Sequence, residues 1–130
     1  MLKIIYAATP SRMYNHKDEI CNLIILNNCI SIHPFLTLPL EIDYEKRYNR
    51  EDIYRACFKL IDCSDELWIF GINNGSLKEY SYAKEQGKST KSFVKLFDPI
   101  WKQQSLNEKY ISYVKVIEEI TKKEEILINS

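Results

Sequence analysis

The fold of this chain follows from residues 68–88, WIFGINNGSLKEYSYAKEQGK, which predict a strand, a glycine turn and a helix in succession. Residues 67–70 form a short apolar run typical of a buried strand. Ser76 is a good N-cap, and Glu79, three residues later, completes a capping box. We therefore predict a helix that starts at Ser76 and ends just before Gly87, its C′ residue.

Two glycines, Gly71 and Gly75, bracket the predicted turn, where glycine permits a positive φ or lets a ligand approach the backbone. The unpaired amides in the first turn of a helix favour anions. Glu79 has two interpretations here. It is either a capping residue that satisfies the Ser76 amide, the commoner role, or a catalytic carboxylate at the carboxyl edge of a sheet, where open α/β folds bind ligands.

The composition describes one globular domain over residues 1–130, because 45% of the residues are hydrophobic and the chain is long enough to bury a core. Eighteen basic and eighteen acidic residues cancel, so we expect no binding to nucleic acid or to a membrane surface. No apolar run approaches the roughly 20 residues of a membrane span, and the N-terminus lacks a signal-peptide pattern. We therefore expect a cytoplasmic protein.

The cysteines show no CxxC spacing, and only two histidines accompany them. We therefore expect reduced thiols and neither a metal site nor a bound cofactor. Three cysteines fall in segments that look buried, whereas Cys63 precedes a strand and is expected to be more exposed.

Strands and helices alternate along the chain, which predicts an α/β fold. We expect a single-domain, three-layer, Rossmann-like sandwich with a mostly parallel sheet of four to five strands and helices on both faces. The other predicted strands cover residues 2–8, 29–32 and 92–97, and the other predicted helices cover residues 16–28, 49–61 and about 106–125. The broad apolar face of the last helix either caps the sheet or pairs with a second subunit.

Polar side chains follow the first two strands at the point where each strand ends. Thr9, Ser11 and Arg12 come after the first strand, and His33 follows the second. Because the carboxyl ends of parallel strands share one edge, we expect Arg12, His33 and Glu79 to converge on a ligand there. The alternatives are that Arg12 is a solvated loop residue and that His33 is a structural hydrogen-bonding group.

Residues 35–49 show no clear periodicity, and a stretch of this length in a compact domain is usually a lid or a binding loop. It carries Phe35, Tyr44 and Tyr48, whose rings suit stacking on a base or a sugar. The other interpretation is that these rings cover the core or a subunit interface. Asp52, in the first turn of the next helix, is favoured there by the helix dipole alone.

Three stretches carry a family pattern: KIIYAATP at 3–10 as an opening strand and loop, CSDELWIFG at 63–71 as an acidic segment, a strand and a glycine, and GSLKE at 75–79 as a glycine-Ser/Thr-x-x-Glu helix start. With SIHP at 31–34, they make the chain resemble the nucleoside 2-deoxyribosyltransferase-like superfamily, and more closely its short phage and bacterial branch of the DUF4406 type. The resemblance covers roughly residues 3–97.

This resemblance implies an enzyme in which Glu79 is a nucleophile that attacks the anomeric carbon of a sugar and releases the base. Water or another base then completes the reaction. Asp52 matches in placement a second carboxylate of the family, which orients the base or assists proton transfer. The transferases carry an acidic residue shortly before the glutamate, whereas this chain has Asn73 and Asn74 there.

The resemblance also implies a substrate site and a homodimer or higher homo-oligomer, since the family's enzymes often complete each site with a residue from a neighbouring subunit. The implied substrate-binding residues are Thr9, Ser11, Arg12, His33, Tyr44, Tyr48, Gly71, Asn74, Gly75 and Ser76. Arg12 would suit a 5′-phosphate, which favours a nucleotide N-hydrolase over a nucleoside transferase. The alternative function is a non-catalytic domain that binds a nucleotide or a nucleotide-derived signal in the same crevice. A weaker third alternative is a phosphoribohydrolase.

Overall fold

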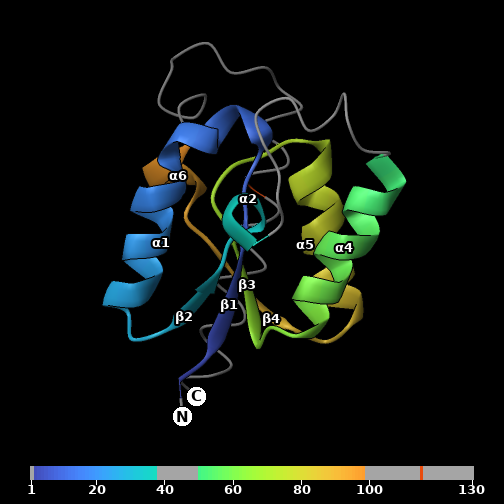
Figure 1. Ribbon diagram of the computed structural model, residues 1–130, viewed down its shortest axis with the longest axis horizontal. Coiled ribbons are helices and arrows are strands. Elements are labelled where there is room, and N and C mark those ends of the chain that lie inside the picture. The colour runs from blue at the N-terminus through green and yellow to red at the C-terminus, as the bar shows by residue number, and fades with distance from the viewer. Residues whose placement is uncertain (1, 38–49, 99–114, 116–130) are drawn as a thin grey trace.

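The computed structural model describes residues 2–37 and 50–98, together with Lys115, which is helical (Figure 1). Tyr44, Tyr48 and the rest of the predicted C-terminal helix lie outside the described residues.

In the described residues, four parallel strands form one sheet with the order β2-β1-β3-β4. The register aligns Tyr6 of β1 with Ile32 of β2 and with Leu67 of β3. This sheet and the helices on its two faces confirm the predicted α/β, Rossmann-like class. The strands are β1 (Ile4–Ala8), β2 (Ile30–Ile32), β3 (Glu66–Ile69) and β4 (Ser89–Ser92).

The helices lie on both sides of the sheet, α1 on one side and α4 and α5 on the other (Figure 1). None of the described helices is both long enough and apolar enough to span a bilayer. The helical elements are η1 (Ser11–His16), α1 (Lys17–Leu26), α2 (Pro34–Thr37), α4 (Arg50–Asp62), α5 (Asn74–Glu85) and α6 (Val94–Phe97).

Side chains of β1 alternate between two cores, as the pleat of a strand requires. Ile5 and Ala7 pack with residues of α1, whereas Tyr6 and Ala8 pack with residues of α4 and α5. The chain passes from the α1 face to the α4–α5 face between β1 and β3, so the direction of winding reverses between these two neighbouring strands. The carboxyl ends of β1 and β3 are therefore the place where an open α/β sheet binds a ligand.

The prediction of a fourth strand over residues 92–97 is wrong, because β4 ends at Ser92 and α6 follows. β4 is the polar run STKS at the edge of the sheet, where a strand needs no continuous apolar pattern. Val94 and Phe97 are three residues apart and lie on one side of a helical turn. The Asp98 amide donates a hydrogen bond to the Val94 carbonyl at 2.9 Å and completes this turn.

Two predicted loops contain helical turns instead. Ser11 and Arg12 begin η1, and Phe35 lies in α2, where its buried ring packs against Tyr14 and His33. The helix predicted over residues 16–28 ends at Leu26, two residues early, and Asn28 after the cap residue adopts a left-handed φ of 60°.

The four cysteines are free thiols. Cys57 is buried, as expected, and Cys63 is exposed, also as expected. Cys21, in α1, and Cys29, just before the edge strand β2, are only half-buried, so the expected burial of these two is only partly met.

Candidate functional site

The start of α5 is capped by Asn73 and not by Ser76, so the predicted capping box is wrong. Asn73 Oδ1 accepts the Ser76 amide at 2.7 Å, and Ser76 Oγ accepts the Asn73 amide at 2.9 Å. Asn73 has extended backbone angles, as an N-cap residue does, and this places Ser76 at the third helical position. The helix thus begins one turn earlier than predicted, and Glu79 is not needed to cap it.

Glu79 instead lies on the buried side of α5, with only 7% of its surface exposed. Ser76 and Ala83, one turn before and after it, are buried on the same side of the helix. Tyr6 of β1 is the sheet residue whose hydroxyl acts on the Glu79 carboxyl. Within the described part of the chain, neither Tyr6 Oη nor Glu79 Oε2 has a partner at normal hydrogen-bonding geometry.

Burial raises the pKa of Glu79 to about 7, and the nearby Tyr6 hydroxyl acts in the opposite direction by hydrogen bonding. Burial and then the Glu79 charge raise the pKa of Tyr6 well above its ordinary value, and the same two causes raise the pKa of the Cys57 thiol to about 12. Glu79, Tyr6 and Cys57 therefore form one buried polar group, contributed by α5, β1 and α4.

No lysine or arginine of the described residues forms an ion pair with Glu79. A carboxyl with a pKa near 7 changes its protonation state at neutral pH, so it is suited to proton transfer and, when ionised, to nucleophilic attack. We define Glu79 and Tyr6 as the candidate site.

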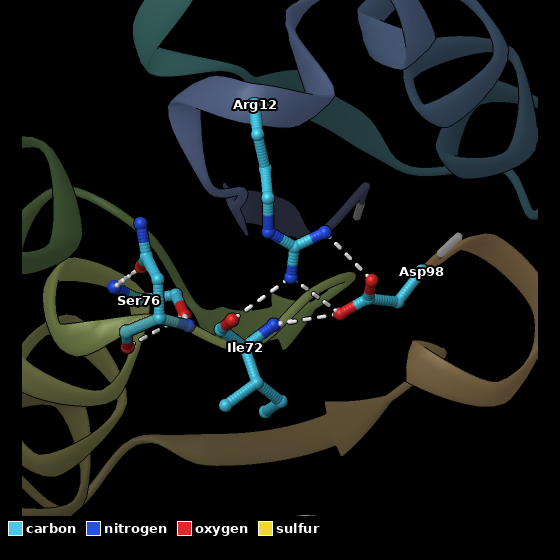
Figure 2. Close-up of polar contacts among 5 residues, drawn as sticks. Arg12, Ile72, Ser76 and Asp98 are labelled. Carbon is cyan, nitrogen blue, oxygen red and sulfur yellow. Dashed lines mark hydrogen bonds and ion pairs between the residues drawn. The ribbon is translucent and has the colours of Figure 1, made fainter. Parts of the chain in front are cut away.

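Arg12 is bound to the protein itself. Its Nη1 and Nη2 donate to the two oxygens of Asp98 at 2.7 and 2.8 Å, and Nη2 also donates to the Ile72 carbonyl at 2.9 Å (Figure 2). Arg12 is thus a residue of η1 whose side chain is still 32% exposed, but its charge is paired with Asp98 and is not, in this arrangement, left to a ligand. Sequence reasoning missed Asp98, which lies 86 positions away along the chain.

The two glycines of the turn differ in what their missing side chains permit. A Cβ on Gly71 would lie 2.3 Å from Met13 Sδ and 2.8 Å from Pro10 Cδ, so this glycine lets the loops after β1 and β3 touch. It does not have the positive φ that we considered. A Cβ on Gly75 would meet nothing closer than 3.5 Å, and the hydroxyl of Tyr54 lies 3.7 Å from that position.

The remaining predicted residues of the first strand and of the turn lie at the carboxyl edge of the sheet. Thr9 is buried and its Oγ1 donates to the Ala7 carbonyl at 3.2 Å, and Ser11 is half-buried at the start of η1. Asn74 is exposed and is the first residue of α5. The hydroxyl of Ser76 is engaged with the backbone of Asn73.

His33 does not join Glu79. Its Nδ1 accepts the Phe35 amide at 3.3 Å, so the proton is on Nε2, which has no hydrogen-bond partner within the described residues. Burial, and secondarily the positive charge of Lys17, lower the pKa of His33 to about 4, against the influence of Asp18. The charges that act on His33 are therefore those at the start of α1, whereas Glu79 is a buried residue of α5 on the other side of the sheet.

Asp52 lies in the first turn of α4, as predicted, but its carboxylate is 69% exposed and 4.0 Å from Arg55 Nη1. The Asp52 carboxylate is therefore not part of the buried polar group of Glu79, Tyr6 and Cys57. No group of three or more His, Cys, Asp or Glu side chains that could hold a metal ion occurs in the described part of the chain.

Tyr6 is a residue of the candidate site that sequence reasoning passed over. Its signal was a tyrosine inside an otherwise apolar strand, because a buried tyrosine hydroxyl usually needs a polar neighbour. In comparisons with known proteins, the sequence matches no protein-family model and no curated protein. Fold and contacts together define an α/β domain with a parallel sheet and a buried carboxyl group that no described cation neutralises.

Proposed function

We propose that the chain is a nucleoside 2-deoxyribosyltransferase-like enzyme that cleaves the base–sugar bond of a nucleoside, a nucleotide or a close derivative. Glu79 is the nucleophile of this reaction. The observation that carries the proposal is the buried Glu79 carboxyl, which faces Tyr6 and has no ion-pair partner among the described residues.

A buried carboxyl group of this kind costs stability. Transferring a carboxyl from water into a protein interior is unfavourable unless hydrogen bonds or opposite charges compensate it, and the Oε2 atom of Glu79 has no such partner within the described residues. An apolar side chain of similar size would pack against β1 without this cost. Strongly perturbed groups of this type concentrate at functional sites.

The chemistry has two steps. The ionised Glu79 attacks the anomeric carbon, the carbon–nitrogen bond breaks, and its electron pair leaves with the base, which takes up a proton. Water then attacks the same carbon of the resulting ester, which restores the carboxylate and releases the sugar. A second base in place of water would give transfer instead of hydrolysis.

Two further residues have defined tasks in this proposal. The Tyr6 hydroxyl favours the ionised form of Glu79, since it lowers the pKa that burial raises. Asp52, in the first turn of α4, supplies or accepts the proton of the base, and its carboxylate is exposed to solvent.

A second candidate function is a non-catalytic domain that binds a nucleotide-derived ligand in the same place. The observation that favours it is the exposure of Asp52 and its contact with Arg55, because Glu79 then lacks a second carboxylate beside it in the described structure. We also propose a cytoplasmic homo-oligomer that completes each site across subunits. A monomer in light scattering would contradict that shared site.

The test is to incubate the protein with a panel of deoxynucleosides, nucleotides and NAD-type ligands and to chromatograph the filtrate. Glu79→Gln is the comparison, since it keeps the shape of the side chain and removes the nucleophile. Free base from wild type but not from Glu79→Gln would support the enzyme and name the substrate. An intact ligand that stays with the protein until denaturation would establish a binding domain and refute the enzyme.

A further inference from the structure

Arg12, Asp98 and the backbone of Ile72 are joined by four hydrogen bonds, which we call the Arg12–Asp98 clamp (Figure 2). The Arg12 guanidinium donates to both Asp98 oxygens and to the Ile72 carbonyl, while Asp98 Oδ2 accepts the Ile72 amide at 3.0 Å. The ion pair thus holds the N–H and the C=O of one residue in the turn that follows β3. Asp98 is fully buried, so water does not compete for it.

The clamp is connected to Glu79 by short steps along the backbone. Ile72 directly precedes Asn73, the N-cap of α5, and Asn73 exchanges two hydrogen bonds with Ser76. Glu79 follows Ser76 on the same buried side of the helix. Where the Ile72 backbone is held therefore sets where α5 begins and how deeply Glu79 enters the core.

The surroundings of the clamp leave this turn little freedom. Gly71 touches Met13 and Pro10 so closely that a Cβ would not fit, and the Ile72 side chain is buried in the core with Tyr6 and Cys57. The turn is thus fixed on its backbone by the ion pair and on its side chains by packing.

We propose that Arg12 and Asp98 are positioning residues, which fix the start of α5 and so hold the Glu79 carboxyl against Tyr6, and that Arg12 does not bind the substrate. The inference rests on the proposed function and goes beyond it, because it moves Arg12 from a phosphate-binding task to a structural one. Arginine suits this task since its planar fork donates to a carboxylate and to a carbonyl at the same time, which a lysine ammonium does not reproduce.

The test uses Arg12→Lys and Asp98→Asn, singly and together, in the full chain. Lys3→Met is the matched control: Lys3 also pairs with a buried carboxylate, Glu66 at 2.7 Å, but at the amino ends of β1 and β3. The kinetic measurement is kcat and KM for a nucleoside and for its 5′-phosphate. The second measurement is the Glu79 pKa by NMR of ¹³C-labelled glutamate carboxyls, with the signal assigned from Glu79→Gln.

We expect each single variant to lower kcat by roughly 10- to 100-fold, since small displacements of a reacting group have effects of this size. KM should change little and equally for both substrates. The kcat of the double variant should be little lower than that of either single variant, because the two residues act as one unit. The Glu79 pKa should fall toward its ordinary value as water reaches a less firmly held helix start, and Lys3→Met should change none of these quantities.

Three outcomes would overturn the proposal. A KM that rises in Arg12→Lys for the phosphorylated substrate alone would mean that Arg12 binds phosphate. An unchanged kcat and an unchanged Glu79 pKa would mean that the clamp only stabilises the fold. If wild type cleaves nothing, the proposed function fails, and a Glu79 pKa that is unchanged in folded Arg12→Lys or Asp98→Asn then refutes the positioning by itself.

Discussion

The Glu79 carboxyl of α5 lies in the protein core beside the Tyr6 hydroxyl of β1, and each group alters the pKa of the other. Burial favours the neutral carboxyl, whereas the phenol favours the carboxylate. The balance leaves Glu79 with a pKa of about 7, so its charge is set by modest changes in its surroundings. This sensitivity is the physical basis of the predictions on Glu79.

Replacing Glu79 with Gln should stabilise the protein at pH 8. The unfolded chain loses the carboxyl proton near pH 4.5, but the folded protein keeps it until about pH 7, so wild-type stability falls as the pH rises between these values. The expected gain is roughly 1–3 kcal/mol at pH 8 and vanishes below about pH 4.5. Urea denaturation at pH 4, 6 and 8 measures it.

Glu85→Gln is the control for this experiment, because Glu85 lies on the same helix but is exposed. Its effect should stay within about 0.5 kcal/mol at each pH. Equal stability of wild type and Glu79→Gln at pH 8, or a difference that grows on acidification, would show that the Glu79 carboxyl is not desolvated.

Replacing Tyr6 with Phe should raise the Glu79 pKa above about 7, because the hydroxyl that favours the carboxylate is lost while the burial remains. If Glu79 is the nucleophile, the rising limb of the kcat/KM profile should move to higher pH. The pH–rate profile of both proteins measures this shift. A lower kcat/KM at every pH with unchanged apparent pKa values would indicate that Tyr6 acts on the substrate and not on Glu79.

Gly71→Ala should be strongly destabilising, since the new methyl group would lie 2.3 Å from Met13 Sδ and 2.8 Å from Pro10 Cδ. Overpacking of this kind costs about 1–3 kcal/mol. Gly75→Ala is the matched control, because its methyl group would meet only ordinary contacts and alanine favours a helix. Thermal denaturation compares the two, and equal melting temperatures would contradict the contact between the loops.

His33 should stay neutral, with its proton on Nε2, down to about pH 5, because burial lowers its pKa to about 4. The unfolded chain takes up this proton near pH 6.5, so the contribution of His33 to stability is lost as the pH falls from there to about 4. A long-range ¹H–¹⁵N spectrum at pH 6 distinguishes the states. An imidazolium pattern for His33 at that pH would show that the ring is hydrated.

Much of the fold can be predicted from local patterns. The apolar run of β1 and the striped α4 are found where the sequence places them, because burial and helical spacing act within a few residues. Gly87 has a φ of 75° as the C′ residue of α5, and it was predictable because glycine adopts this left-handed conformation without steric cost. The polar edge strand β4 escaped prediction since it buries little and so leaves no apolar pattern.

The candidate site depends on contacts that no local pattern contains. Asn73 and Ser76 are both good N-caps, and the backbone of Ile72, held by Arg12 and Asp98, is consistent with the choice of the first. The partners of this clamp are 86 positions apart, so their pairing cannot be read from either segment. Glu79 was predicted as a site residue, but its burial beside Tyr6 follows only once the helix start is known.

As the proposed nucleophile, Glu79 forms a covalent bond to the sugar. The most direct measurement starts the reaction with a substrate that the protein cleaves and quenches it rapidly. The protein is then digested with trypsin, and the peptide that begins at Glu79 and ends at Lys84 is analysed by mass spectrometry. In wild type this peptide should carry the mass of one sugar, whereas Glu79→Gln should neither carry the sugar nor release base. A sugar attached to another residue, or base release by Glu79→Gln at the wild-type rate, would contradict this role of Glu79.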